Sequence, residues 1–254
     1  QSLLRELDQL NRRADADGQI AASDDIQQQA YEVLLGGGVA QALDLSREDK
    51  QVLQRYDTAR YVRSKDQWNR VSRGRSGYYT ANASSIGKLL LLARRLCQAG
   101  CGFVTIHASY AGVWDMHADG NNLTMLEGMD AIGYSYAHAV AAFIEDLERL
   151  GLTDEILLVT SGEMGRTPRI NKNGGRDHWA RLAPLLIHGG GTRPGQVIGQ
   201  SDRQGGEPIT SRYTPANLIS TIMNTVFDVG QLRLVPSVSD QVMKLANEKP
   251  IPLA

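Results

Sequence analysis

Helical and β-type apolar runs alternate along the second half of the chain, and this alternation is its strongest fold constraint. Apolar side chains recur at helical spacing over residues 86–98, 129–150 and 215–227. Short continuous apolar runs, typical of buried strands, occupy residues 103–106, 156–160 and 184–187. Strands alternating with helices favour right-handed crossovers, so the sequence predicts an α/β fold with a mostly parallel sheet.

The amino-terminal third has a different character. Residues 2–63 are polar with helical periodicity, and Ser46 is predicted to cap one of their helices, as Thr214 caps the late helix. Residues 61–85 are rich in charge, glycine and serine without periodicity, which predicts a long loop. We therefore predict a helical segment and loop over residues 1–84 that packs on or caps a core over 85–254. One single domain is the alternative.

Composition narrows the classes of partner. Lysine and arginine (27) nearly balance aspartate and glutamate (28), so no global field favours nucleic acid. No apolar run reaches transmembrane length, and no signal peptide opens the chain, so we expect no membrane span. Because the sequence enters a helical pattern directly at Gln1, we expect a processed or truncated product. Cys97 and Cys101 are interpreted as small buried hydrophobes, with a redox or metal role as the alternative.

Three short clusters of acids, histidines and arginines lie in loops near the apolar runs. They contain Asp115 with His117, Glu163 with Arg166, and Asp177 with His178. Asp115 and His117 are one residue apart, so an extended loop projects both to the same side. Carboxylate and imidazole groups that converge from strand ends are what a divalent metal site of a hydrolase requires.

Each cluster alone has a simpler interpretation. Asp115 could cap a turn beside a solvated His117, Glu163 and Arg166 could form an exposed ion pair, and His178 could be a hydrogen-bonded core residue. Three such loops around one α/β core together favour a site. The ligand types suit zinc, manganese, magnesium or calcium, and the sequence leaves the metal's identity open.

These residues also carry a family resemblance. Residues 113–117 (VWDMH) resemble a GWDTH motif, residues 161–168 (SGEMGRTP) a TSEFGRTP motif, and residues 175–179 (GRDHW) a GRDHW motif. The chain resembles DUF1501 proteins, a bacterial family related to the alkaline phosphatase and sulfatase superfamily. The resemblance implies a three-layer α/β/α sandwich whose amino-terminal strands are missing from this chain. It implies metal ligation by Asp115, His117, Glu163, Asp177 and His178, and stabilisation of the transferring group by Arg166.

The function implied is metal-dependent hydrolysis of phosphate or sulfate esters, on small molecules or carbohydrates. In the superfamily a metal-activated serine, threonine or formylglycine attacks the ester, and no such residue is identified here. The alternative is a non-catalytic binding or scaffold protein with the phosphatase fold. A serine esterase is disfavoured because the sequence has no Gly-x-Ser-x-Gly elbow. The resemblance implies a periplasmic or exported location, and the oligomeric state stays open.

Overall fold

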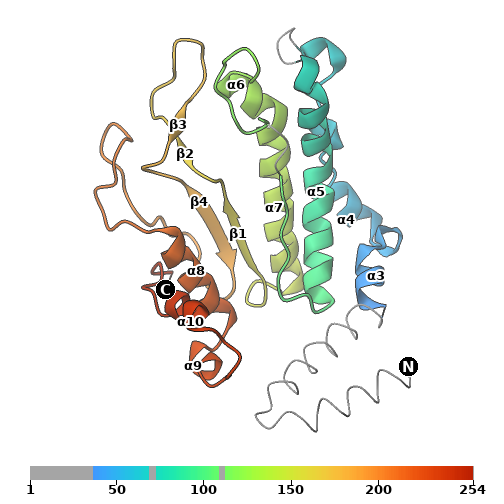
Figure 1. Cartoon of the computed structure of the whole chain (residues 1–254). Coiled ribbons are helices and arrows are strands. Elements are labelled where there is room, and N and C mark those ends of the chain that lie inside the picture. Colours follow the sequence, from blue (N-terminus) through green and yellow to red (C-terminus); the bar gives the residue numbers. More distant parts are fainter. Residues whose placement is uncertain (1–36, 69–72, 109–111, 254) are drawn as a thin grey trace, which may run out of the picture.

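A computed structural model describes residues 37–68, 73–108 and 112–253 (Figure 1). The helices are α3 (Gly38–Leu43), α4 (Lys50–Arg55), α5 (Ser76–Gln98), α6 (Met125–Gly128), α7 (Tyr134–Leu150), α8 (Pro215–Val226), α9 (Val229–Leu232) and α10 (Asp240–Ala246). Single 3-10 turns are η1 (Leu45–Arg47), η2 (Ala59–Tyr61), η3 (Lys65–Gln67) and η4 (Arg73–Arg75), and a π-helical turn, η5 (Met129–Gly133), joins α6 to α7. The strands are β1 (Leu157–Ser161), β2 (Gly165–Arg166), β3 (His178–Trp179) and β4 (Leu185–Gly189). The predicted helical pattern before residue 37 lies outside the described residues.

The long helices α5 and α7 lie side by side and form the centre of the molecule (Figure 1). Their facing sides, with Tyr56 from the end of α4 and Ile156 before β1, bury one apolar core. The core consists of Tyr56, Ile86, Leu90, Leu91, Ala139, Val140, Ala142, Phe143, Leu147 and Ile156. Their spacing of three and four residues along each helix is what places them on one face. The predicted helix over 129–150 is confirmed, and it extends back to Met125 through the π-helical turn.

The predicted parallel sheet, and with it the phosphatase-like sandwich, is wrong for the described residues. β1 pairs with β4 antiparallel, Leu157 opposite Gly189 and Ser161 opposite Leu185, and β2 pairs antiparallel with β3. The two ladders succeed each other along one long hairpin beside α7 (Figure 1). Parallel neighbours need a crossover, usually a helix, whereas the chain between β1 and β4 contains no helix and returns directly.

The predicted strand over residues 103–106 is also absent. This segment forms no ladder with any described strand, and the Phe103 side chain is exposed. An apolar run becomes a strand only when a neighbour completes its backbone hydrogen bonds. The apolar composition of the run does not reveal whether such a neighbour exists.

Two local predictions for the helices are corrected and one is confirmed. The helix expected from residue 86 begins at Ser76, inside the predicted loop. Asp44 and Asp49, rather than Ser46, cap η1 and α4, because their carboxylates accept the backbone N–H two residues on. Thr214 does cap α8, through a capping box with Asn217.

The described helices also bear on the domain and membrane predictions. Residue 84, the predicted boundary between the two parts of the chain, lies within α5. The division stays a prediction. Across the described ranges, no helix combines the length and apolarity that a bilayer crossing needs.

Candidate metal centre

The loop that carries Asp115 and His117 is held by buried apolar anchors on either side of them. Val113 is fully buried and Met116 nearly so, in a second apolar cluster with Trp68, Tyr79, Leu123, Ala131 and Ile132. Asp115 and His117, on either side of Met116, are less buried than these anchors. Trp114 adds a further tie, since its indole N–H donates to the Ala108 carbonyl at 2.8 Å.

The short helix α6, which precedes α7, packs against the same loop. A Cβ at Gly128, the last residue of α6, would lie 2.6 Å from the Met116 sulfur, so glycine lets that side chain pack directly on the helix. After His117, Ala118 has a left-handed φ of 56°, and the Asp119 carboxylate accepts the N–H groups of Asn121 and Asn122. A non-glycine residue in this region costs free energy, which the surrounding contacts must offset.

The other half of the centre lies on the short β2–β3 ladder of the hairpin. Arg166 is directly opposite His178, and opposite residues of an antiparallel pair project from the same face. This register brings a guanidinium and an imidazole together over the loop that holds Asp115. Gly165 permits it, since a Cβ there would lie only 1.5 Å from the Leu182 carbonyl oxygen.

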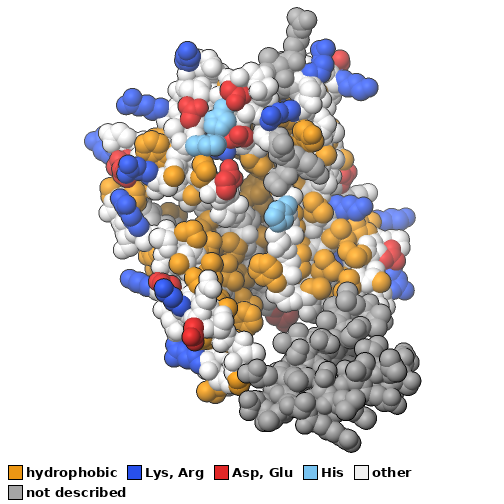
Figure 2. All heavy atoms as spheres, in the orientation of Figure 1, with side chains coloured by type: hydrophobic (Ala, Val, Ile, Leu, Met, Phe, Trp, Pro, Cys, Tyr) orange, Lys and Arg blue, Asp and Glu red, His pale blue; other side chains and the backbone are white. Residues whose placement is uncertain are grey.

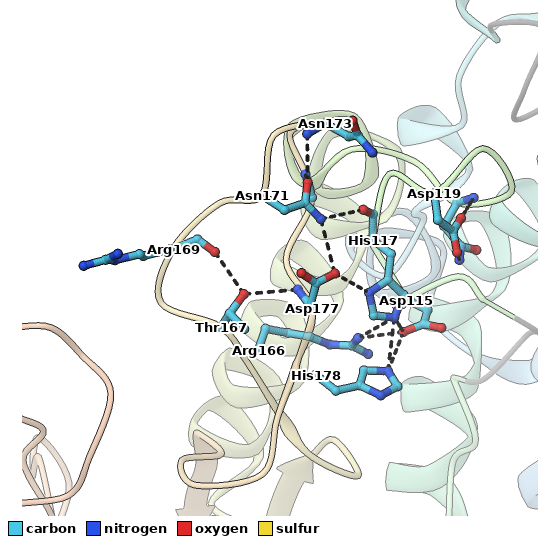
Figure 3. Close-up of polar contacts among 12 residues, drawn as sticks. Asp115, His117, Asp119, Arg166, Thr167, Arg169, Asn171, Asn173, Asp177 and His178 are labelled. Atoms are coloured by element: carbon cyan, nitrogen blue, oxygen red, sulfur yellow. Dashed lines mark hydrogen bonds and ion pairs between the residues drawn. The ribbon is translucent and has the colours of Figure 1, made fainter.

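Three predicted ligands converge to form what we call the Asp–His–His triad: Asp115, His117 and His178 (Figure 3). Asp115 Oδ1 lies 2.7 Å from His117 Nε2 and 3.1 Å from His178 Nε2. The two Nε2 atoms lie 3.1 Å apart. Within the part of the chain that the structure describes, no other three acid, histidine or cysteine side chains gather in this way.

The remaining two predicted ligands lie outside the triad. Asp177 Oδ1 is 3.3 Å from Nδ1 of His117, the ring nitrogen that faces away from the centre. Glu163 is largely exposed and reaches the cluster only through Arg166, with 3.5 Å between Oε1 and Nη2. The predicted site residues therefore divide into three central side chains, one that contacts His117 from behind, and one at the margin.

Arg166 is the cationic member of the centre. Its Nη1 donates to Asp115 Oδ1 at 2.6 Å and lies 3.3 Å from His117 Nε2. Burial raises the pKa of Asp115, but the hydrogen bonds from Arg166 and His178 and the neighbouring positive charges lower it more, so the pKa lies below its ordinary value. Asp115 is therefore a carboxylate at neutral pH and can serve as a ligand.

The facing atoms of the triad need a proton or a cation between them. If His117 carries its proton on Nδ1, toward Asp177, then its Nε2 lone pair faces a carboxylate oxygen 2.7 Å away. Ligands of a tetrahedral zinc ion lie about 3.3 Å apart, a few tenths of an ångström more than these atoms. The donor set thus fits a divalent ion that leaves at least one coordination position open.

The centre is open to solvent. The His178 side chain is 52% exposed, and the His117 side chain 17%. Figure 2 shows histidine and acidic side chains gathered on the surface toward one end of the molecule, with basic side chains around them. A small solute can reach the triad from this face.

Sequence reasoning missed Asn171. Its side chain contacts both the His117 backbone and Asp177, from the loop that joins β2 to β3 (Figure 3). The only available signal was its place in the turn-forming stretch between Arg166 and Asp177.

The cysteines lie away from this site. Cys97 is partly buried against the helical core, and burial raises the pKa of its thiol.

The comparisons with known proteins identify the family. The model of a protein family of unknown function, DUF1501, matches residues 1–251. The chain therefore belongs to the DUF1501 family. Neither the curated proteins nor the solved structures contain a match to it.

Proposed function

We propose that this protein binds one divalent cation through Asp115, His117 and His178 and hydrolyses phosphate or sulfate esters. One observation carries the proposal: three donor atoms, each within 3.1 Å of the other two, converge beside the guanidinium of Arg166. A cation would supply Lewis-acid activation of an ester and of the attacking water. The relation to the alkaline phosphatase and sulfatase superfamily is part of this proposal, through the three motifs alone.

The donor set favours zinc among the divalent ions. Two imidazoles and one carboxylate are typical of catalytic zinc sites, whereas calcium and magnesium prefer oxygen ligands. With Asp177 and Glu163 outside the triad, only one oxygen ligand remains. Manganese, which accepts mixed ligands, is the second choice.

Arg166 selects the anionic group of the substrate. Its Nη1 contacts Asp115 and its Nη2 contacts Glu163, whose side chain is largely exposed. A phosphate or sulfate oxygen can replace Glu163, whose contact is long, and gain a charge-assisted hydrogen bond. The guanidinium would then stabilise charge that develops on the transferring group.

Thr167, the hydroxyl residue next to Arg166, is not free to act as a nucleophile. Thr167 Oγ1 donates to the Arg169 carbonyl at 2.9 Å and accepts the Asp177 N–H at 3.1 Å, so it is committed to the loop. We therefore propose direct attack by water on the ester. Small molecules or carbohydrates remain the proposed substrates, and a periplasmic or exported location remains a prediction of the resemblance.

The test begins with metal analysis of the full chain purified without chelator, which should show about one zinc or manganese ion per molecule. Aryl phosphate and aryl sulfate turnover is then measured for the wild type, His178→Ala and Asp115→Asn. His138→Ala, a histidine that contacts Arg55 and Arg60 away from the triad, is the matched control and should keep its activity. Absence of a bound ion after zinc and manganese loading would refute the proposal.

A non-catalytic binding protein is the second candidate. It is favoured by the 2.6 Å contact of Arg166 with Asp115, which already balances one charge of the centre within the protein. It predicts stoichiometric metal and measurable phosphate or sulfate binding with no turnover of either ester panel. Turnover that disappears in His178→Ala would exclude it.

A further inference from the structure

Asn171 lies between the two halves of the candidate centre. Its Nδ2 donates to the His117 carbonyl oxygen at 2.9 Å and to Asp177 Oδ1 at 3.2 Å. The same Asp177 oxygen faces Nδ1 of His117 at 3.3 Å. Asn171, Asp177 and His117 thus form a closed set of contacts, which holds His117 at its backbone carbonyl and at the outer nitrogen of its ring (Figure 3).

The other end of the Asn171 amide fixes the hairpin loop. Its Oδ1 accepts the N–H groups of Asn173 at 3.0 Å and Gly175 at 2.9 Å. All the hydrogen-bonding capacity of the amide is used, two donors toward the centre and two acceptors toward its own loop. A flipped amide would point its NH2 group at two N–H donors, so these partners define one orientation.

The contact between the two halves is close, which makes this orientation matter. A Cβ at Gly175 would lie 2.2 Å from the carbonyl carbon of His117, and the Arg176 N–H donates to the Met116 carbonyl at 2.9 Å. The hairpin loop therefore lies directly against the backbone of the ligand loop. Asn171 is the side chain that bonds that backbone and the carboxylate behind the imidazole.

We propose that Asn171 is a positioning residue, which aims Nε2 of His117 at the cation by holding both the His117 backbone and the Asp177 carboxylate. Hydrogen bonds to the outer nitrogen of a metal-binding histidine orient the ring and strengthen the ligand. Asn171 extends this effect one step further from the metal. The inference rests on the proposed cation site and gives a role to a residue that neither binds the ion nor touches the substrate.

The experiment measures zinc affinity and, separately, manganese affinity in the full chain, by competition with a chelating dye. Asn171→Ala should weaken binding by about 10-fold, at the lower end of the range typical of outer-shell partners. Asn173→Ala is the matched control, since it keeps the backbone N–H that Asn171 accepts, and it should bind as the wild type does. Urea unfolding of the metal-free proteins shows whether each variant is folded.

A double-mutant cycle separates positioning from general support of the loop. Asn171→Ala and Asp177→Ala should be non-additive, the double variant binding zinc about as weakly as the weaker single variant, because both act through His117. Asn171→Ala and Glu163→Ala should be additive, since Glu163 contacts only Arg166 here. If Asn171→Ala does not fold, Asn171→Gln, which moves the same amide by one methylene, replaces it with the same expected loss.

The outcomes distinguish this inference from the function on which it rests. A wild type that binds neither zinc nor manganese overturns both. A wild type that binds, with Asn171→Ala or Asn171→Gln of equal affinity, overturns the positioning role alone. Additive losses with Asp177→Ala would likewise overturn it, leaving Asn171 as a loop residue only.

Discussion

Two clusters of charged side chains differ in how their charges are satisfied. One, the buried ion-pair network, consists of Glu48, Arg94, Arg95 and Asp146 around the carboxyl-terminal half of α7, with the largely exposed Arg149 at its edge. Arg94 lies 3.0 Å from Glu48 and 3.1 Å from Asp146, and the side chains of these three residues are 6%, 12% and 5% exposed. The other cluster is the Asp–His–His triad with Arg166, near the far end of the helix pair.

The difference shows what each cluster requires. In the buried network, each acid faces an arginine, so the protein itself completes the set. In the triad, Arg166 likewise pairs with Asp115, but the Nε2 atoms of two imidazoles also converge on the same carboxylate oxygen. Two neutral imidazole nitrogens that face each other across a carboxylate oxygen are satisfied only by a proton or by a cation between them. The network therefore serves the fold, and the triad is suited to a ligand.

The largest expected effect breaks the buried network. Asp146→Ala leaves Arg94 buried without one of its two carboxylates and removes the acceptor of the Tyr56 hydroxyl. We expect it to lower the free energy of unfolding by about 3–5 kcal/mol, as loss of one partner from a buried pair does. Urea denaturation followed by circular dichroism measures this. Glu145→Ala, the exposed neighbour that pairs with Arg55, is the control and should cost less than about 1 kcal/mol.

His178→Ala, in contrast, should lower metal affinity and leave the stability of the fold almost unchanged. Because His178 is half exposed and on the surface of the hairpin, its loss should change the free energy of unfolding of the metal-free protein by less than about 0.5 kcal/mol. Zinc affinity should fall by more than about 100-fold, since even outer-shell residues cost 10- to 100-fold. Isothermal titration measures the affinity. A variant that loses stability but keeps zinc would assign His178 to the fold and remove the contrast.

Arg166→Gln should strengthen cation binding, because the guanidinium competes with a cation for Asp115 Oδ1. We expect a rise in zinc affinity of about threefold to tenfold, with loss of inhibition by phosphate and sulfate. Arg169→Gln is the matched control, since Arg169 points away from the triad in Figure 3. Weaker zinc binding in Arg166→Gln would mean that the arginine supports the ligands instead of competing with them.

The smallest expected effect is a change in the free energy of unfolding at acidic pH. Because the pKa of Asp115 is lowered in the folded protein, its carboxylate contributes stability that is present above the ordinary pKa of 3.8 and lost as pH falls through the lower folded value. The difference in unfolding free energy between the wild type and Asp115→Asn should therefore shrink as the pH falls from about 5 to about 3. Urea titrations at several pH values test this. A difference that grows on acidification would contradict the direction of the shift.

Sequence alone predicted several elements correctly because their signals are local. The apolar periodicity over 129–150 and the runs at 156–160 and 184–187 each correspond to an observed element, and Thr214 caps its helix. Strand direction is not local. It depends on the chain between β1 and β4, which has no helical pattern and therefore returns as an antiparallel partner, in contrast to the helix–strand alternation elsewhere.

The candidate centre was predictable to the same degree. The one-residue spacing of Asp115 and His117 did indicate that their side chains meet, with 2.7 Å between Oδ1 and Nε2, but the backbone there is a tight turn closed by the His117 N–H on the Asp115 carbonyl and not the extended loop that we predict. That Arg166 meets His178 depends on the register of a ladder only two residues long, which no periodicity can reveal. Whether Asp177 and Glu163 reach the same point as the triad residues depends on how the hairpin bends, which the sequence does not reveal. Whether any of the five binds a metal stays a prediction.

Gly165 and Gly175 have a consequence for anyone who would transplant this centre to another scaffold. At each, a methyl group would strike a backbone atom of the opposing segment, a clash that no change of rotamer relieves. A designed site that copies the histidines and carboxylates but places alanine at either position would force the neighbouring backbone segments apart. The design rules for the transplant are therefore set by two hydrogen atoms as much as by the side chains that do the chemistry.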